Sequence, residues 1–261
     1  MTSYQVGAQM YSVRDRIQTY DGLLAALKEL KAGGYNTCQI SGVGKDITAE
    51  EIRRACDLAE VTCTSTHIGF EEMEQDIEGV IRRHQIMGCK YPGIGGLPGI
   101  YRESSEGYAE FAKRATAVAE KLEKAGMHFI YHSHHFEFKR LPDGKVGYDV
   151  LVENSSNALQ FELDCFWAQV GGQNVLETIR RLKGRMDVIH FKDLEICEYP
   201  NVGMTTIGDG AMDYKAIMAA AEEIGVKYAY VEQDNAVDAE CGSVACLVRS
   251  AQWLKANGAR L

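Results

Sequence analysis

Hydrophobic positions along the chain change their spacing repeatedly, from short β-rich runs to longer stretches with helical periodicity. Alternation of this kind is typical of parallel strands joined by crossover helices. About eight such units can be counted, each with a strand short enough for a barrel. The expected strands are Tyr4–Met10, Thr37–Ile40, Val61–His67, Tyr91–Gly95, His128–His134, Leu159–Leu163, Val188–Phe191 and Tyr228–Glu232.

Capping signals mark where the intervening helices begin and end. Asp21 precedes one helical stretch, Thr48 and Glu51 fit a capping box, and Asp213 precedes another stretch. Glycines follow several of these stretches, at the positions where helix C-caps are expected. They are Gly33, Gly34, Gly88, Gly126 and Gly225. His84 lies within one helical stretch, and we expect it at the surface.

The order of elements favours a closed barrel over a doubly wound open sheet. Such a sheet usually carries a glycine-rich phosphate loop after its first strand, whereas this turn reads Gln9-Met10-Tyr11-Ser12-Val13-Arg14. The 261 residues fit one (β/α)₈ barrel, which takes roughly 250 residues. We therefore expect the α/β class, with a single TIM-barrel domain over residues 1–261.

Charge and composition narrow the range of partners. The chain has 28 basic and 37 acidic residues, a net charge of −9, and no basic stretch, which argues against nucleic-acid binding. No apolar run approaches the roughly 18 residues of a membrane helix, and the first residues lack the pattern of a secretory signal. The eight cysteines form no CxxC pair. We expect a cytoplasmic protein with reduced thiols and no membrane partner.

Ionisable residues close four consecutive expected strands in the second half of the chain. They lie in the stretches His132-Ser133-His134-His135-Phe136-Glu137, Glu162-Leu163-Asp164, Val188-Ile189-His190-Phe191-Lys192-Asp193 and Val231-Glu232-Gln233-Asp234. Catalytic groups of a barrel come from such strand ends. Three carboxylates and one imidazole meeting there would repel one another unless a cation lay among them. Oxygen and nitrogen donors without thiolates suit Mn²⁺, Mg²⁺, Co²⁺ or Zn²⁺, of which we expect Mn²⁺.

Some of these residues have a structural interpretation as well. Asp164 could cap a helix beginning at Cys165. His132 and His134 share one face of a strand, since residues two apart point to the same side, and we expect them under the metal ion or the substrate. His135 points to the other face and is not expected to function. His67 ends the third strand as either a substrate contact or a hydrogen-bonded core histidine.

Fragments spread over the whole chain resemble a known family. They are Gln9-Met10-Tyr11-Ser12-Val13-Arg14, Tyr131-His132-Ser133-His134-His135-Phe136-Glu137-Phe138, Glu162-Leu163-Asp164 with Trp167, His190-Phe191-Lys192-Asp193, Gly208-Asp209-Gly210 and Val231-Glu232-Gln233-Asp234. In order and spacing they resemble the sugar phosphate isomerase/epimerase family of xylose isomerase-like TIM barrels. The resemblance implies a sugar-converting enzyme of carbohydrate metabolism, with a small-molecule sugar as substrate and a homo-oligomeric assembly.

The resemblance also implies roles for particular residues. It maps the metal ligands onto Glu137, Asp164, His190 and Glu232, and it makes Glu137 and Glu232 acid/base candidates. One departure leaves an alternative open. Characterised epimerases carry a glutamate earlier on the fifth strand, near the level of His132 here, so Glu137 could be a substrate contact while His132 or His134 approaches the ion.

The expected chemistry is removal of a proton from a carbon beside a carbonyl. A metal ion would stabilise the enediolate, and a carboxylate or imidazole such as His132 would take the proton. Lys192 could hold a substrate oxygen, or it could be a surface lysine paired with Asp193. His134, Tyr11, Arg14 and Trp167 are further candidates for contacts with the sugar. Gly208-Asp209-Gly210 is either a weak phosphate loop or a turn before the next helix.

Several reactions share this first step. Return of the proton gives epimerisation or isomerisation, whereas loss of a β-substituent gives a lyase, as in inosose dehydratases and deglycosidases of 3-keto glycosides, which this chain also resembles. Two other classes are alternatives. A non-catalytic sugar-binding barrel is one. The related endonuclease IV proteins are the other, and they require a trinuclear zinc site and a surface that attracts DNA, which the net charge of −9 disfavours.

Overall fold

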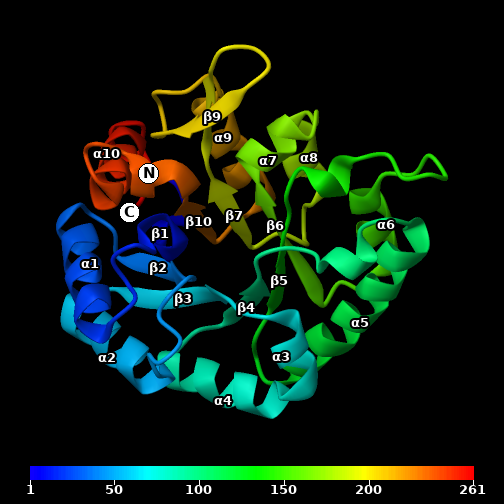
Figure 1. The fold of residues 1–261 in the computed structure, drawn as a ribbon, viewed down its shortest axis with the longest axis horizontal. Coiled ribbons are helices and arrows are strands. Elements are labelled where there is room, and N and C mark those ends of the chain that lie inside the picture. Colours follow the sequence, from blue (N-terminus) through cyan, green and yellow to red (C-terminus); the bar gives the residue numbers. More distant parts are fainter.

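The computed structural model describes residues 1–261 and closes eight parallel strands into a barrel (Figure 1). The strands are β1 (Gln5–Gln9), β2 (Thr37–Ile40), β3 (Thr62–His67), β4 (Tyr91–Ile94), β5 (Phe129–His132), β6 (Leu159–Asp164), β7 (Val188–Phe191) and β10 (Tyr228–Val231). Each strand pairs with its neighbours along the chain, and β1 closes the barrel on β10. The expected (β/α)₈ barrel and its eight strands are confirmed, with shifts of one or two residues at strand ends.

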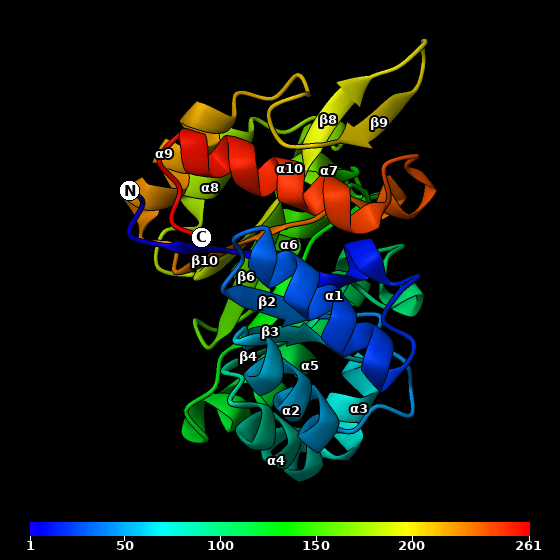
Figure 2. The same ribbon diagram turned by 90° about the vertical axis from the view of Figure 1, so that its left-hand side faces the viewer.

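Helices surround the barrel on its outer side (Figures 1 and 2). The α-helices are α1 (Tyr20–Ala32), α2 (Ala49–Ala59), α3 (Phe70–Gln75), α4 (Ile77–Met87), α5 (Ser105–Lys124), α6 (Gly147–Asn154), α7 (Cys165–Val170), α8 (Val175–Arg181), α9 (Tyr214–Ile224) and α10 (Ser243–Ala256). Short 3₁₀ helices are η1 (Met10–Val13), η2 (Gly99–Tyr101), η3 (Phe136–Phe138) and η4 (Asp234–Asp238). None of the helices combines the length and the apolar character needed to cross a membrane.

Two of the three capping signals place a helix start correctly. Thr48 and Glu51 form the reciprocal capping box of α2, and the Asp213 side chain accepts a hydrogen bond at the start of α9. Helix α1 differs from the expectation. Its N-cap is Thr19, whose hydroxyl accepts from the backbone N–H of Gly22, so the helix begins before Asp21. Asp21 then lies in the first turn, where a carboxylate complements the helix dipole.

The expectation that His84 lies at the surface is wrong. The side chain is 1% exposed and joins α4 to β3. Its Nδ1 atom lies 2.7 Å from the carbonyl oxygen of Val80, which can only accept, so Nδ1 carries the proton. Its Nε2 atom then accepts from the Thr66 hydroxyl at 2.8 Å. Both ring nitrogens are satisfied, which makes a buried neutral imidazole possible.

Side chains inside the barrel are stacked at a spacing of two residues. Tyr91, Ile130, Val188 and Tyr230 form an apolar layer near the N-terminal ends of their strands. Because side chains alternate between the two faces of a strand, the interior positions that follow are His132, His190 and Glu232. The barrel therefore changes from apolar to ionisable toward the C-terminal ends of its strands.

An antiparallel hairpin, which the sequence did not lead us to expect, follows β7 directly. It consists of β8 (Asp193–Ile196) and β9 (Val202–Thr205). The hairpin projects from the barrel, as seen from the side in Figure 2. Since it starts at the C-terminal end of β7, it stands beside the end of the barrel where the ionisable residues lie.

Candidate active site

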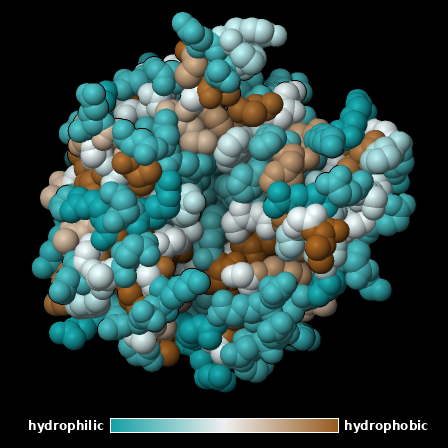
Figure 3. Space-filling model, in the orientation of Figure 1, coloured by the Kyte–Doolittle hydropathy of each residue, from teal (hydrophilic) through white to brown (hydrophobic).

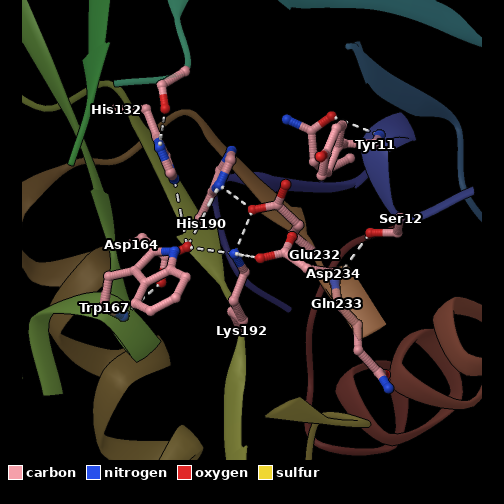
Figure 4. Close-up of polar contacts among 12 residues, drawn as sticks. Tyr11, Ser12, His132, Asp164, Trp167, His190, Lys192, Glu232, Gln233 and Asp234 are labelled. Carbon is pink, nitrogen blue, oxygen red and sulfur yellow. Dashed lines mark hydrogen bonds and ion pairs between the residues drawn. The ribbon is translucent and has the colours of Figure 1, made fainter. Parts of the chain in front are cut away.

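Four ionisable side chains from four strands converge at the C-terminal end of the barrel (Figure 4). His132 ends β5, Asp164 ends β6, His190 lies in β7 and Glu232 directly follows β10. One nitrogen or oxygen atom from each lies within 4.8 Å of the others, and all four residues are buried. The face shown in Figure 3 is hollowed near its centre, where the strands of Figure 1 converge.

The donor atoms of this cluster fit a divalent cation. The Nε2 atom of His132 is buried without a hydrogen-bond partner, and the buried Oδ2 atom of Asp164, 3.4 Å away, has its closest charged contact with Lys192 Nζ at 3.0 Å. Unpartnered buried polar atoms are costly and rare in native proteins. Nitrogen and oxygen ligands bind Zn²⁺ at about 2.0–2.2 Å, which separates two such ligands by up to about 4.4 Å. Small movements would therefore close the four side chains around one ion.

Lys192 supplies positive charge to the same cluster. Its Nζ atom lies 2.7 Å from Glu232 Oε2, 3.0 Å from Asp164 Oδ2 and 3.2 Å from Asp234 Oδ2, and the side chain is 1% exposed. Burial alone would lower the pKa of Lys192, but these three carboxylates raise it above its usual value. The interpretation of Lys192 as a surface lysine is therefore wrong.

Asp193 faces away from Lys192 and organises a loop. Its Oδ2 atom accepts backbone hydrogen bonds from Gly208 and Gly210, and its Oδ1 atom accepts one from Met212. The backbone N–H groups that a phosphate would need are thus taken by a carboxylate. Gly208-Asp209-Gly210 is a turn before α9, as one of the two sequence interpretations had it.

Glu137 does not join the ionisable cluster. It lies in η3, where its Oε1 atom accepts from the Tyr131 hydroxyl at 2.6 Å and its Oε2 atom accepts from the backbone N–H of His134 at 2.9 Å. Burial raises the pKa of Glu137 to about 8. The chain leaves the barrel wall after His132, so Glu137 turns back toward Tyr131 on the outer side of β5. Of the two alternatives for the fifth strand, the structure places His132 with Asp164, His190 and Glu232.

Asp164 caps a helix, as one of the two interpretations had it, and its other oxygen faces the cluster. Its Oδ1 atom accepts from the backbone N–H of Trp167 at 2.9 Å and caps α7. Its other oxygen, Oδ2, faces His132 and Lys192. The cap fixes the orientation of the carboxylate, so the helix start also positions the oxygen that faces the cluster.

A second polar layer, which the sequence reasoning missed, lies next to the cluster. Glu162 is fully buried, with Oε2 2.5 Å from His67 Nε2 and Oε1 3.1 Å from His190 Nε2. Gln39 donates to Glu162 Oε1 at 2.8 Å and accepts from His190 Nε2 at 2.6 Å. Gln39 Oε1 also accepts from Gln9 Nε2 at 2.5 Å, so this oxygen is shared by two donors. The spacing of Glu162 two residues before Asp164 was a signal that both face the interior.

The charges of this layer are coupled to those of the cluster. Burial alone would raise the pKa of Glu162, but His190 and His67 lower it below its usual value. Burial alone would lower the pKa of His190, but Glu162 and Glu232 raise it to about 10. His67 contacts Glu162, and its ring also lies 5.3 Å from that of His132 and 5.6 Å from that of His190, which belongs to both layers.

The remaining candidates lie around the rim of the barrel end. The His134 ring lies 5.5 Å from that of Trp167, and its Nδ1 atom is buried without a partner. Burial lowers the pKa of His134, so its ring is neutral. Lys192 Nζ lies 5.4 Å from the centre of the Trp167 ring. On η1, Tyr11 is 39% exposed, and Arg14 stacks on it and donates to the backbone carbonyl of Asp234.

Comparison with known families matches residues 27–256 to the model of the xylose isomerase-like TIM barrel family. The chain belongs to this family. Among solved structures, this xylose isomerase-like barrel is similar to a sugar phosphate isomerase/epimerase from Parabacteroides distasonis, with a TM-score of 0.82 and 23% identity over 98% of this chain and 95% of that one. No curated protein sequence matches it.

Two further solved structures resemble the xylose isomerase-like barrel described here. An L-ribulose 3-epimerase matches with a TM-score of 0.72 and 15% identity, over 97% of this chain and 94% of that one. An IolI protein with a bound zinc atom matches with a TM-score of 0.69 and 14% identity, over 97% of each chain. At these identities the likeness establishes the fold.

Proposed function

We propose that this protein is a metal-dependent sugar isomerase or epimerase that removes a proton from a carbon beside a carbonyl. The observation that carries the proposal is the buried cluster of His132, Asp164, His190 and Glu232, in which His132 Nε2 has no hydrogen-bond partner, at the end of the barrel where catalytic groups lie. The names of two similar structures, a sugar phosphate isomerase/epimerase and an L-ribulose 3-epimerase, support this choice.

In this proposal His132, Asp164, His190 and Glu232 hold one divalent ion. When bound, the ion supplies positive charge that stabilises the negative charge developing on the sugar oxygens. Mn²⁺ remains the expected ion. Because the set has two imidazoles, Co²⁺ and Zn²⁺ suit it better than Mg²⁺, which prefers oxygen ligands. The IolI structure with its zinc atom is consistent with a cation in barrels of this shape.

Glu232 is the proposed base. Its contacts with His190 and Lys192 all use Oε2, which leaves Oε1 without a hydrogen-bond partner and able to accept a proton. Lys192 would donate to a substrate oxygen in exchange for one of its three carboxylate contacts, and the neutral ring of His134 can donate to or accept from a hydroxyl. Trp167 offers an aromatic surface for a sugar ring. Glu137 takes a positioning role, because it fixes the backbone of His134.

A lyase remains the alternative, since it begins with the same proton removal. Incubation with ketoses, inososes and 3-keto glycosides in D₂O tests both. The protein should place deuterium beside a carbonyl in one of them, and the product distinguishes an epimer, an aldose–ketose pair or an eliminated fragment. Glu232→Gln should slow exchange roughly 10²–10⁴-fold, the usual contribution of a general base.

The control for this experiment is Glu153→Gln, which changes an exposed glutamate on α6 and should leave exchange unchanged. Elemental analysis of the purified protein should find about one divalent ion per chain. Full exchange activity in Glu232→Gln would defeat the assignment of the base. Failure to retain or respond to any of Mn²⁺, Co²⁺, Zn²⁺ or Mg²⁺ would defeat the metal site, since an ion that binds the folded chain must stabilise it.

A further inference from the structure

A cavity of about 480 Å³ adjoins the ionisable cluster on the side of the β8–β9 hairpin. Its volume lies within the roughly 300–1,000 Å³ typical of small-molecule sites. Three elements form its walls, namely α7, β9 and η4. The residues that line it are Phe166, Trp167, Val170, Val202, Gly203, Met204, Asp234, Asn235 and Asp238.

The cavity lies next to the proposed reaction site. Lys192 Nζ lies 3.2 Å from Asp234 Oδ2 and 5.4 Å from the centre of the Trp167 ring, and both of these residues line the cavity. Figure 4 shows Trp167, Lys192 and Asp234 side by side next to Asp164 and Glu232. A substrate whose reacting carbon lies near Glu232 would therefore extend into the cavity with any group attached to it.

The hairpin wall is fixed against the rest of the barrel. Asn235 on η4 donates from its side-chain amide to the backbone carbonyl of Met204 on β9 at 2.9 Å. The apolar lining comes from Val202 and Met204 on β9 and from Phe166, Trp167 and Val170 on α7, and hydrophobic residues gather near the base of the hairpin in Figure 3. The wall thus combines an apolar surface with an anchored backbone, which is suited to holding a ligand in one orientation.

The charges of the cavity indicate which ligand it accepts. Its only charged lining residues are the carboxylates of Asp234 and Asp238, and no lysine, arginine or histidine lines it. The ammonium of Lys192 is already surrounded by the carboxylates of Asp164, Glu232 and Asp234. A phosphate dianion here would be repelled, whereas sugar hydroxyls can donate to carboxylates and the faces of a ring can pack on aromatic side chains.

We infer that this cavity is a second subsite, which binds a neutral glycosidic substituent, so that the substrate is an unphosphorylated glycoside whose reacting sugar carries the carbonyl. This inference rests on the proposed function for the reacting ring and adds the class of substrate. Residues of the β8–β9 hairpin then determine specificity, because Met204 forms the wall opposite Trp167 without contacting the reacting carbon.

Binding of unreactive probes tests the subsite independently of catalysis. The chain has two tryptophans, and Trp253→Phe leaves Trp167 as the single indole reporter at the cavity. Titration of this variant with phenyl glucoside should quench fluorescence at a concentration at least roughly tenfold lower than with glucose, because a buried apolar substituent adds binding energy. Glucose 6-phosphate should bind no more tightly than glucose.

Hairpin variants then locate the effect. Met204→Ala should reduce the preference for phenyl glucoside over glucose by roughly tenfold. Ile196→Ala is the matched control, since Ile196 lies on β8 outside this cavity and is 70% exposed. Asp238→Lys, at an exposed position, should improve binding of glucose 6-phosphate by removing a negative charge and adding a positive one.

Three outcomes would overturn the subsite: equal quenching midpoints for phenyl glucoside and glucose, no quenching by phenyl glucoside, or tighter binding of glucose 6-phosphate to the unaltered cavity. Its failure is distinguishable from failure of the proposed function. Absence of deuterium exchange with every keto sugar, together with selective binding of the glycoside, would refute the reaction and leave the subsite supported. Deuterium exchange without a binding preference for the glycoside would support the reaction and refute the subsite.

Discussion

Replacement of Lys192 by methionine should affect the metal-free protein far more than the metal-loaded protein. Lys192 Nζ contacts Asp164 Oδ2 and Glu232 Oε2, and both carboxylates belong to the proposed set of metal ligands. In the structure the ammonium therefore contacts the same carboxylate oxygens that would face a bound ion. Lys192→Met keeps most of the aliphatic volume and removes only the charge and its hydrogen bonds.

The magnitude follows from burial. The side chain of Lys192 is 1% exposed, and the two contacts measure 3.0 and 2.7 Å. Removing one partner of a buried ion pair costs roughly 3–5 kcal/mol, because the other charge is left uncompensated. A bound divalent ion supplies that charge instead. If about 3 kcal/mol of the loss is confined to the metal-free form, the same free energy appears as roughly 100-fold tighter metal binding.

Urea unfolding with a chelator and with saturating Mn²⁺ or Zn²⁺ measures the two stabilities, and calorimetric titration measures the dissociation constant of the metal. Lys227→Met is a matched control, because Lys227 is 56% exposed and pairs with Asp187. It should cost at most about 1 kcal/mol in both forms. Equal destabilisation of Lys192→Met with and without metal, at an unchanged dissociation constant, would show that the ammonium and the ion do not share these oxygens.

Three other predictions test separate parts of the structure. His132→Ala should lose more bound metal than Glu137→Gln by elemental analysis, and the reverse order would return the ligand role to Glu137. Burial lowers the pKa of His84 from 6.5 to about 4. The contribution of its neutral ring to the free energy of unfolding is therefore fully present above pH 6.5 and is lost as the pH falls toward 4. In urea unfolding, the free energy of unfolding should fall by up to about 3 kcal/mol more on acidification in the wild type than in His84→Gln. The same dependence of this free energy on pH in both proteins would contradict the prediction. All eight thiols should react in reduced, denatured protein. A mild oxidant added to the folded protein should remove only the thiols of Cys241 and Cys246, whose Sγ atoms lie 3.5 Å apart. Loss of other thiols would show that these two are not the reactive pair.

The eight barrel strands were predictable because their outward side chains pack under helices and form short apolar runs. The β8–β9 hairpin was not, and the reason lies at its start. Asp193 follows β7 after a single intervening residue, Lys192, with no glycine or proline to indicate a turn. The chain changes from barrel strand to hairpin because the Asp193 carboxylate binds the backbone of residues 208–212, a contact between segments distant in sequence.

The choice between His132 and Glu137 depended on where the chain leaves the barrel wall. Both lie in one polar stretch, and alternation along β5 predicts the direction of His132 only while the strand continues. The strand ends at His132, and η3 begins at Phe136. Beyond the strand, the direction of Glu137 is set by the Tyr131 hydroxyl and the His134 backbone, and residue spacing carries no information about those partners.

Glu162 shows what a closer use of the same spacing rule would have found and what it would have missed. The rule places Glu162 on the same interior face as Asp164, so its burial inside the barrel was predictable. Its partners were not, because His67 and Gln39 come from β3 and β2, which are not neighbours of β6, and the stagger of the closed barrel decides which interior side chains meet. Since Glu162 also contacts His190, which is shared with the four-residue cluster, a mutation in this deeper layer should act on metal binding through the orientation of the His190 ring.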